Sequence, residues 1–196
     1  MDQLINIIGT YYLSGFVILN VLYLNIRMND SVNQIMRDTY SEQNVVAISQ
    51  ILEYDIYKVG HSASGDIILK ADSTAFTFRS DLDNNNVIDT VFYTMSTPTT
   101  LSTTRNPRDF IVYRQVNSSG AKLTVAYSTS LKFTYSDATG AKMSYVSIAG
   151  TAQASRNNIK YITTYVKCES SDSLSTDART AYSPVEWQMK IRPKNI

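Results

Sequence analysis

The sequence contains one histidine and one cysteine among its 196 residues, and this scarcity excludes several common kinds of metal, disulfide and catalytic site. A structural zinc site needs about four Cys or His ligands, and an intrachain disulfide needs two cysteines, so neither can form. Serine and cysteine hydrolases would all depend on His61. We therefore expect the chain not to be an enzyme, and we interpret His61 as a capping or surface residue and Cys168 as a small apolar residue within a strand.

Charge is also scarce, since 18% of the residues are charged against about 25% in an average soluble domain. The 18 basic and 17 acidic residues nearly cancel, so there is no overall electrostatic reason to expect nucleic-acid binding. The basic residues form no stripe, and we interpret the following as solvated surface: Arg27, Arg37, Lys58, Arg79, Arg105, Arg108 and Arg114.

Charge is absent altogether from residues 3–26, a run of 24 residues. As a helix this run would be about 36 Å long, enough to cross a hydrocarbon core of about 30 Å. Gly9, Gly15 and Asn20 make it less apolar than an ordinary lipid-facing span, and such residues usually face other helices. We interpret residues 1–27 as a helix that is anchored in a membrane and also packs against protein. The alternative is a buried core helix of a soluble protein, whereas a signal peptide is disfavoured because no Lys or Arg precedes the apolar run.

The helical pattern continues beyond this segment, because no proline occurs before Pro98 and no glycine lies between Gly15 and Gly60. Apolar residues at spacings near three and four indicate an amphipathic helix over residues 28–60, which Gly60 would end. We predict one continuous helix from about residue 4 to residue 59. The apolar stripe consists of Val32, Ile35, Met36, Val45, Ile48, Leu52, Ile56 and Val59.

After Gly60 the apolar residues alternate with a period of two, which is typical of strands. Ser-Gly at 119–120 and Thr-Gly at 139–140 predict hairpin turns, and polar loops are expected at 102–109 and 170–183. The sheet should be mainly antiparallel, because no helices separate the strands. The predicted fold class is thus α+β, with a globular domain at 28–196 whose sheet, over 66–192, packs on the apolar stripe. The predicted strands are 66–70, 75–80, 87–95, 110–116, 123–127, 131–137, 142–148, 159–169 and 185–192.

Residues 80–89 form a loop rich in Asp and Asn between two predicted strands. Its oxygen-bearing side chains alternate as in the first nine positions of an EF-hand loop, where they converge on calcium. Asn86 replaces the usual glycine, and Phe92 stands where a bidentate glutamate would be. We predict a calcium site of modest affinity, the alternative being a metal-free turn. The proposed ligands are Asp81, Asp83, Asn85, the carbonyl of Val87, and Asp89.

Several local sequences resemble the type IV pilin-like superfamily. The sequence GFVILN at 15–20 resembles the prepilin peptidase junction, and ILEYDIYKVG at 51–60 resembles the end of the long helix in PilW-like minor pilins and J-type pseudopilins. Residues 78–91 resemble the strand, acidic loop and strand of these proteins, and Tyr113-Arg114 with residues 187–195 fits their C-terminal part. The resemblance covers most of the chain in order. It implies a pilin-like fold with an extracytoplasmic globular domain.

The sequence departs from the family at the peptidase junction. Asn20 stands where the family has the glutamate that pairs with a neighbour during assembly, and no basic residue precedes Gly15. Cleavage before Phe16 would leave 11 residues ahead of Arg27, too few to span a bilayer. We therefore expect an uncleaved or unusually processed chain.

The leading hypothesis is a structural subunit of a bacterial envelope-anchored filament or secretion pseudopilus. Its assembly helix would use Gly9, Gly15, Phe16 and Asn20, and its partners would be copies of itself or other pilin-like subunits. The alternative is a monomeric, membrane-anchored binding module or adhesin, whose 14 tyrosines and Ser/Thr-rich loops would contact a glycan or a protein.

Overall fold

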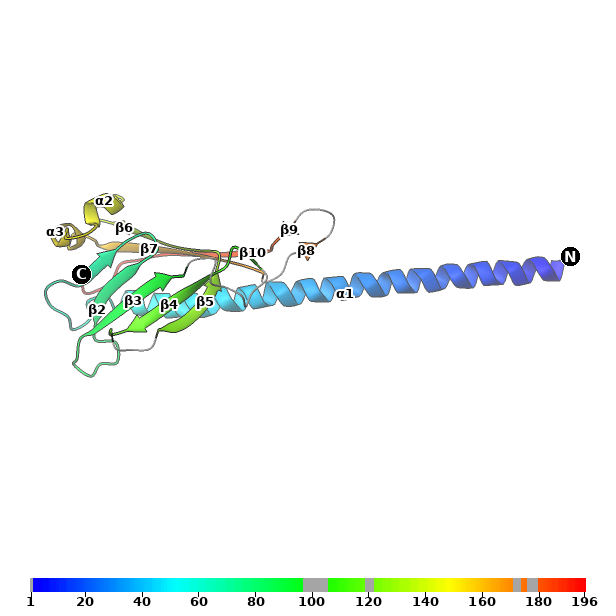
Figure 1. Cartoon of the computed structure of the whole chain (residues 1–196), viewed down its shortest axis with the longest axis horizontal. Helices are drawn as coiled ribbons and strands as arrows, with labels where there is room; N and C mark the ends of the chain where they lie inside the picture. Colours follow the sequence, from blue (N-terminus) through cyan, green and yellow to red (C-terminus); the bar gives the residue numbers. More distant parts are fainter. Residues whose placement is uncertain (1, 97–105, 119–121, 171–173, 176–179) are drawn as a thin grey trace. The chain divides into compact units, whose positions relative to one another are not determined.

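The computed structural model describes residues 2–96, 106–118, 122–170, 174–175 and 180–196 (Figure 1). Its contacts divide the chain into two compact units, Met1–Thr39 and Tyr40–Ile196. The domain boundary predicted at residues 27/28 rests on composition and stays a prediction. The turn predicted at 119–120 lies outside the described residues, as do parts of the loops predicted at 102–109 and 170–183.

Helix α1 is continuous over Asp2–Tyr57, as the absence of proline and of any glycine between Gly15 and Gly60 predicts. It ends two residues earlier than predicted, in a turn that leads to Gly60. Gly60 has a φ of +77° and its N–H donates to the carbonyl oxygen of Arg79 at 2.9 Å. A Cβ at this position would lie 2.9 Å from the carbonyl oxygen of Asn195. Both the left-handed conformation and the close backbone approach therefore require glycine here.

Two antiparallel sheets follow α1, and Figure 1 shows them as separate layers. The five-stranded sheet has its strands in chain order: β1 (Ile68–Ala71), β2 (Phe76–Ser80), β3 (Asp89–Met95), β4 (Phe110–Val116) and β5 (Leu123–Ser128). The three-stranded sheet has the order β10-β7-β6, with β6 at Ser130–Ser136, β7 at Tyr161–Glu169 and β10 at Pro184–Ile191. The predicted α+β fold, a long N-terminal helix followed by antiparallel sheet, is confirmed. The two-stranded ribbon of β8 (Leu174–Ser175) and β9 (Thr180–Ala181) falls within a predicted loop.

The strand predicted at 142–148 is wrong. After the turn at 137–140, which has Gly140 at a φ of +87°, only Lys142 pairs with β6, through Ser136. The hydroxyl oxygen of Ser144 then accepts the N–H of Val146 and caps helix α2 (Tyr145–Ile148), and helix α3 (Gln153–Arg156) follows. The cap from Ser144 therefore favours a helix at residues 145–148, where the alternating apolar pattern predicts a strand.

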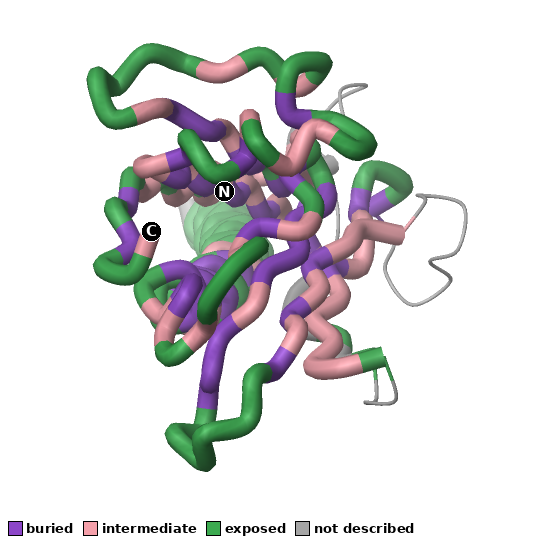
Figure 2. The backbone as a smooth tube through the Cα atoms, turned by 90° about the vertical axis from the view of Figure 1, so that its left-hand side faces the viewer, coloured by how far each residue is buried: buried purple, intermediate pink, exposed green. Residues whose placement is uncertain are grey.

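The apolar stripe of α1 is buried from Val45 onward, where it joins the core shared by both sheets (Figure 2). Ile48, Leu52 and Ile56 are fully buried and belong to one cluster with aromatic residues of both sheets. The prediction that the sheet covers the whole stripe is wrong for its first part. Val32, Ile35 and Met36 are exposed, because the unit that contains the sheets begins only at Tyr40. The aromatic members of the core are Phe76, Phe78, Tyr93, Phe133 and Tyr135.

Strand β7 alternates as predicted, with Ile162, Thr164 and Val166 buried and the intervening residues half-buried. Thr164 is fully buried, and its hydroxyl has no hydrogen-bond partner among the described residues. A buried hydroxyl without a partner costs about 1–3 kcal/mol of stability.

Replacing Thr164 with valine is therefore expected to stabilise the fold by about 1 kcal/mol, because a methyl group takes the place of the unpaired hydroxyl. Thermal unfolding of the full-length chain in detergent, followed by circular dichroism, measures the change. Thr163→Val, on the half-buried face of the same strand, is the matched control and should change stability by less than about 0.5 kcal/mol. Destabilisation by Thr164→Val would show that the hydroxyl has a partner.

Candidate functional site

The first part of α1 presents apolar side chains to solvent on all sides. Leu13 and Phe16 are each 67% exposed, and no residue of the apolar segment is buried within the described chain. By length and composition α1 is able to cross a membrane. A core helix of a soluble protein would instead bury one face. The helix therefore needs an apolar environment, either lipid or other helices, that the described residues do not supply.

The predicted assembly residues lie along this exposed segment. At 3.6 residues per turn, Gly9, Phe16 and Asn20 share one face of α1, and Gly15 lies about a third of a turn away. A Cβ added at either glycine would meet nothing within 4 Å, so contacts within the chain do not require glycine there. The side-chain amide of Asn20 donates to the carbonyl oxygen of Phe16 at 2.8 Å. Its donor is thus paired within the helix, as a segment in lipid requires.

The second part of α1 is joined to the five-stranded sheet by a buried ion pair. Arg114 on β4 donates from Nε to Asp55 Oδ2 at 2.6 Å and from Nη2 to Asp55 Oδ1 at 3.0 Å. The hydroxyl of Tyr93 on β3 donates to Asp55 Oδ2 at 2.5 Å. Both oxygens of this fully buried carboxylate are therefore paired, by donors from two neighbouring strands.

The environment of this ion pair shifts two pKa values. Burial, followed by the Asp55 carboxylate, raises the pKa of Tyr93 well above its usual value near 10. The hydrogen bond to Asp55 raises the pKa of Arg114. Both groups therefore stay protonated at neutral pH and hold α1 to β3 and β4.

The interpretation of Arg114 as solvated surface is wrong, because its side chain is only 19% exposed and is bound to Asp55. One signal in the sequence points to this pair. Asp55 lies beside Ile56, within the apolar stripe of the helix, where a carboxylate must find a buried partner.

The acidic loop between β2 and β3 is held by its own side chains. The buried carboxylate of Asp81 accepts the N–H of Asn85 at 3.1 Å and the N–H of Asn86 at 3.0 Å. Asn86 has a φ of +64°, so asparagine does take the left-handed position expected of a glycine. Asp83 accepts from both the backbone and the side-chain amide of Asn85.

The other predicted calcium ligands are also engaged in hydrogen bonds. Asp89 Oδ1 accepts from the side-chain amide of Asn117 at 2.8 Å, and Asn85 Oδ1 accepts the N–H of Val87 at 2.7 Å. The ammonium group of Lys58 donates to the carbonyl oxygen of Leu82 at 2.6 Å. Among the described residues, no three Asp, Glu, His or Cys side chains lie together as a metal-binding group. Calcium binding by this loop stays a prediction.

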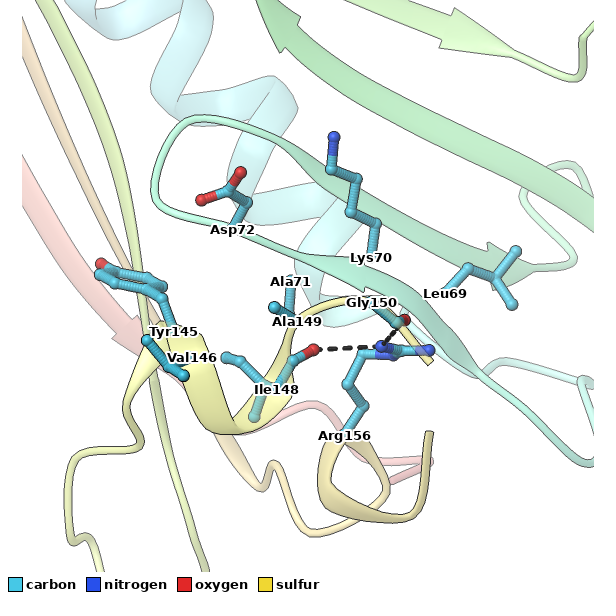
Figure 3. Close-up of a pocket in the computed structure, with 10 residues that line it drawn as sticks. All are labelled: Leu69, Lys70, Ala71, Asp72, Tyr145, Val146, Ile148, Ala149, Gly150 and Arg156. Atoms are coloured by element: carbon cyan, nitrogen blue, oxygen red, sulfur yellow. Dashed lines mark hydrogen bonds between the residues drawn. The ribbon is translucent and has the colours of Figure 1, made fainter. Parts of the chain in front are cut away.

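A cavity of about 480 Å³ lies between β1 and α2 (Figure 3). Three charged residues line it, Lys70, Asp72 and Arg156, and of these only Arg156 is buried, with hydrogen bonds mainly to carbonyl groups. Nη1 donates to the carbonyl oxygens of Ile148 at 3.1 Å and Gly150 at 2.8 Å, and Nε donates to that of Ile68 at 3.1 Å. Nη2 donates to the side chain of Gln153 at 2.7 Å. The guanidinium group therefore ties α2 and α3 to the edge of β1, which is a structural role.

Cys168 is buried, as the sequence predicts, and burial raises the pKa of its thiol to about 12. At pH 8 only about one thiol in 10⁴ would be ionised, and the thiolate is the reactive form. We expect iodoacetamide not to label the folded chain, and to label it fully in denaturant, as measured by mass spectrometry. A cysteine at the exposed position of Val146 is the control and should react in the folded state. Rapid labelling of Cys168 in the folded state would contradict its burial.

No family model, curated protein or solved structure matches the chain. The resemblance to pilins therefore stays a prediction.

Proposed function

We propose that this chain is a structural subunit of a type IV pilus-like filament or secretion pseudopilus, and that it assembles through the first part of α1. The observation that carries the proposal is the exposed, uncharged segment over residues 3–26, which needs apolar partners on every side. The local sequences that resemble minor pilins and pseudopilins support it. The expected partners are copies of this chain or other pilin-like subunits.

In this mechanism the helix has two successive environments. Before assembly the apolar segment lies in the membrane, with the side chains of Thr10 and Asn20 bonded to its own backbone. In the filament the same segment packs against neighbouring helices, and Gly9 and Gly15 let the backbones approach closely. The unit Tyr40–Ile196 then lies on the extracytoplasmic side, and the proposal gives it no catalytic role.

Adding a side chain at one of the exposed glycines tests this packing. Gly9→Leu should leave the isolated chain folded, because nothing lies within 4 Å of the added Cβ. It should weaken helix association by about tenfold, which corresponds to a loss of about 1.4 kcal/mol. Oxidative crosslinking between copies that carry Leu24→Cys, in native membranes, measures the association. The native cysteine, Cys168, is buried, so crosslinks should form only through the cysteine introduced at position 24.

Val21→Leu is the matched control, since it adds a similar side chain to the same segment without filling a glycine. It should leave crosslinking unchanged. Equal crosslinking in Gly9→Leu and Val21→Leu would contradict packing through the glycine. No crosslinking even without these substitutions would favour the alternative, a monomeric membrane-anchored binding module.

A further inference from the structure

The polar side chains of the uncharged segment are spread unevenly around α1. At 3.6 residues per turn, the residues spaced alternately three and four apart from position 3 to position 24 share one face about 100° wide. Four of these seven residues carry an amide or a hydroxyl group. We call this face the polar stripe, and it consists of Gln3, Asn6, Thr10, Leu13, Val17, Asn20 and Leu24.

The face opposite the polar stripe is bulky and apolar, and none of its side chains carries an amide. Leu19 and Leu22 on this face are 66% and 55% exposed. Large apolar side chains suit lipid, whereas polar side chains of membrane helices usually face other helices. The two faces therefore need different surroundings. The opposite face consists of Leu4, Ile8, Tyr11, Tyr12, Gly15, Leu19, Leu22 and Ile26.

Asn20 is the residue of the polar stripe that most needs a partner. It lies about 9 Å along the helix from the end of the uncharged run, which is inside the hydrocarbon core of a membrane that the segment spans. Its side-chain amide has two N–H groups and an oxygen, and one N–H donates to the carbonyl oxygen of Phe16 at 2.8 Å. The second N–H and the side-chain oxygen have no partner among the described residues. In hydrocarbon these groups need a partner from another chain.

The same stripe on a second copy of the chain supplies that partner. Copies anchored in one membrane have the same orientation, so their helices are parallel and identical residues can meet. Because an amide both donates and accepts, Asn20 of one copy can bond to Asn20 of the other. Alternate spacings of three and four are those of left-handed helix pairs, in which an asparagine can fix the register. No charge in the segment opposes this approach, and Gly9 at the border of the stripe lets the backbones come close.

We propose that two copies of the chain pair in the membrane through their polar stripes, with the helices parallel and the Asn20 side chains bonded to each other. The opposite face, which includes Gly15, then contacts lipid until further helices cover it in the filament. The inference rests on the membrane-anchored α1 of the proposed function and adds a step before assembly.

Oxidative crosslinking through introduced cysteines, in native membranes from which surface filaments have been sheared, tests this pairing. Leu24→Cys lies in the polar stripe, and Leu22→Cys lies on the opposite face, about 160° away and at nearly the same depth. We expect Leu24→Cys to give a band of twice the mass of the chain. Leu22→Cys, the matched control, should give no such band. Cys168 is buried in both variants.

Replacing Asn20 tests the hydrogen bond itself. Asn20→Leu, combined with Leu24→Cys, should weaken the pairing about threefold, which is the average effect of one hydrogen bond between membrane helices. Asn25→Leu is the matched control, because Asn25 lies outside the polar stripe and its side-chain oxygen accepts from Asn29 within the same helix at 3.0 Å. It should leave the crosslinked fraction unchanged.

Equal crosslinking through Leu22→Cys and Leu24→Cys would overturn the polar stripe as the contact face and leave assembly through α1 intact. No crosslinked band from either position would overturn the pair, and crosslinks to a different protein alone would overturn the second copy as the partner. An unchanged crosslinked fraction in Asn20→Leu would overturn the bond between the asparagines. Presence of the chain in sheared filaments is measured separately, so failure of the pairing and failure of the proposed function are distinguishable.

Discussion

Replacing Asp55 with asparagine is expected to destabilise the unit Tyr40–Ile196 by about 3 kcal/mol. The change removes the charge that binds both Arg114 and Tyr93 and leaves the guanidinium without its carboxylate. Breaking a buried ion pair on one side costs about 3–5 kcal/mol, and the partial exposure of Arg114 places the value near the lower limit. Urea denaturation of the full-length chain in detergent measures the loss.

Two further variants distinguish the effect of losing the ion pair from a general loss of helix stability. Glu53→Gln removes an exposed carboxylate two residues earlier on α1 and should change stability by less than about 0.5 kcal/mol. The triple variant Asp55→Leu/Tyr93→Phe/Arg114→Met should recover much of the loss, because it leaves neither a buried charge nor the hydroxyl of Tyr93 without a partner. A loss below about 1 kcal/mol for Asp55→Asn would mean that the ion pair does not fasten α1 to the sheet.

The second large effect is expected from a charge in the apolar segment. Leu13→Lys places an ammonium group near the middle of residues 3–26, where a charged residue costs about 2.5–3.5 kcal/mol of membrane insertion. The cost corresponds to a shift of about 100-fold or more in the partition between membrane and soluble fractions. Extraction of membranes with carbonate, followed by immunoblotting, measures this partition.

Leu13→Met is the matched control, since it keeps an apolar side chain of similar size, and it should stay in the membrane fraction. Because Leu13 is 67% exposed, neither substitution removes a contact within the chain. Folding of the unit Tyr40–Ile196 should therefore be unaffected in both variants. Retention of Leu13→Lys in membranes at the level of the control would show that this segment is not the anchor.

The sequence predicts those parts of the fold that depend on local patterns. Helix α1 was predictable because the sequence has no proline before Pro98 and no glycine between Gly15 and Gly60. Strand β7 was predictable because Ile162, Thr164 and Val166 alternate with polar or aromatic residues. Helices α2 and α3 could not be predicted in this way. Each is only four residues long, and Arg156 of α3 binds the carbonyl group of Ile68, which lies 88 residues away in the sequence.

The same reasoning holds for the candidate site. The uncharged segment is visible in the sequence because it is contiguous. The Asp55–Arg114 pair joins residues 59 apart, so the place of Asp55 in the apolar stripe indicates that it needs a partner but not which residue that partner is. The interpretation of Arg114 as surface charge is wrong because the sequence does not show that it pairs with Asp55.

The central claim, that the chain is a filament subunit, is tested most directly by shearing surface filaments from cells and analysing them by intact-protein mass spectrometry. We predict that the chain is present in the sheared filaments and that its mass includes the apolar segment over residues 3–26. A chain that stays entirely in the membrane fraction, while filaments without it are recovered, would contradict the account.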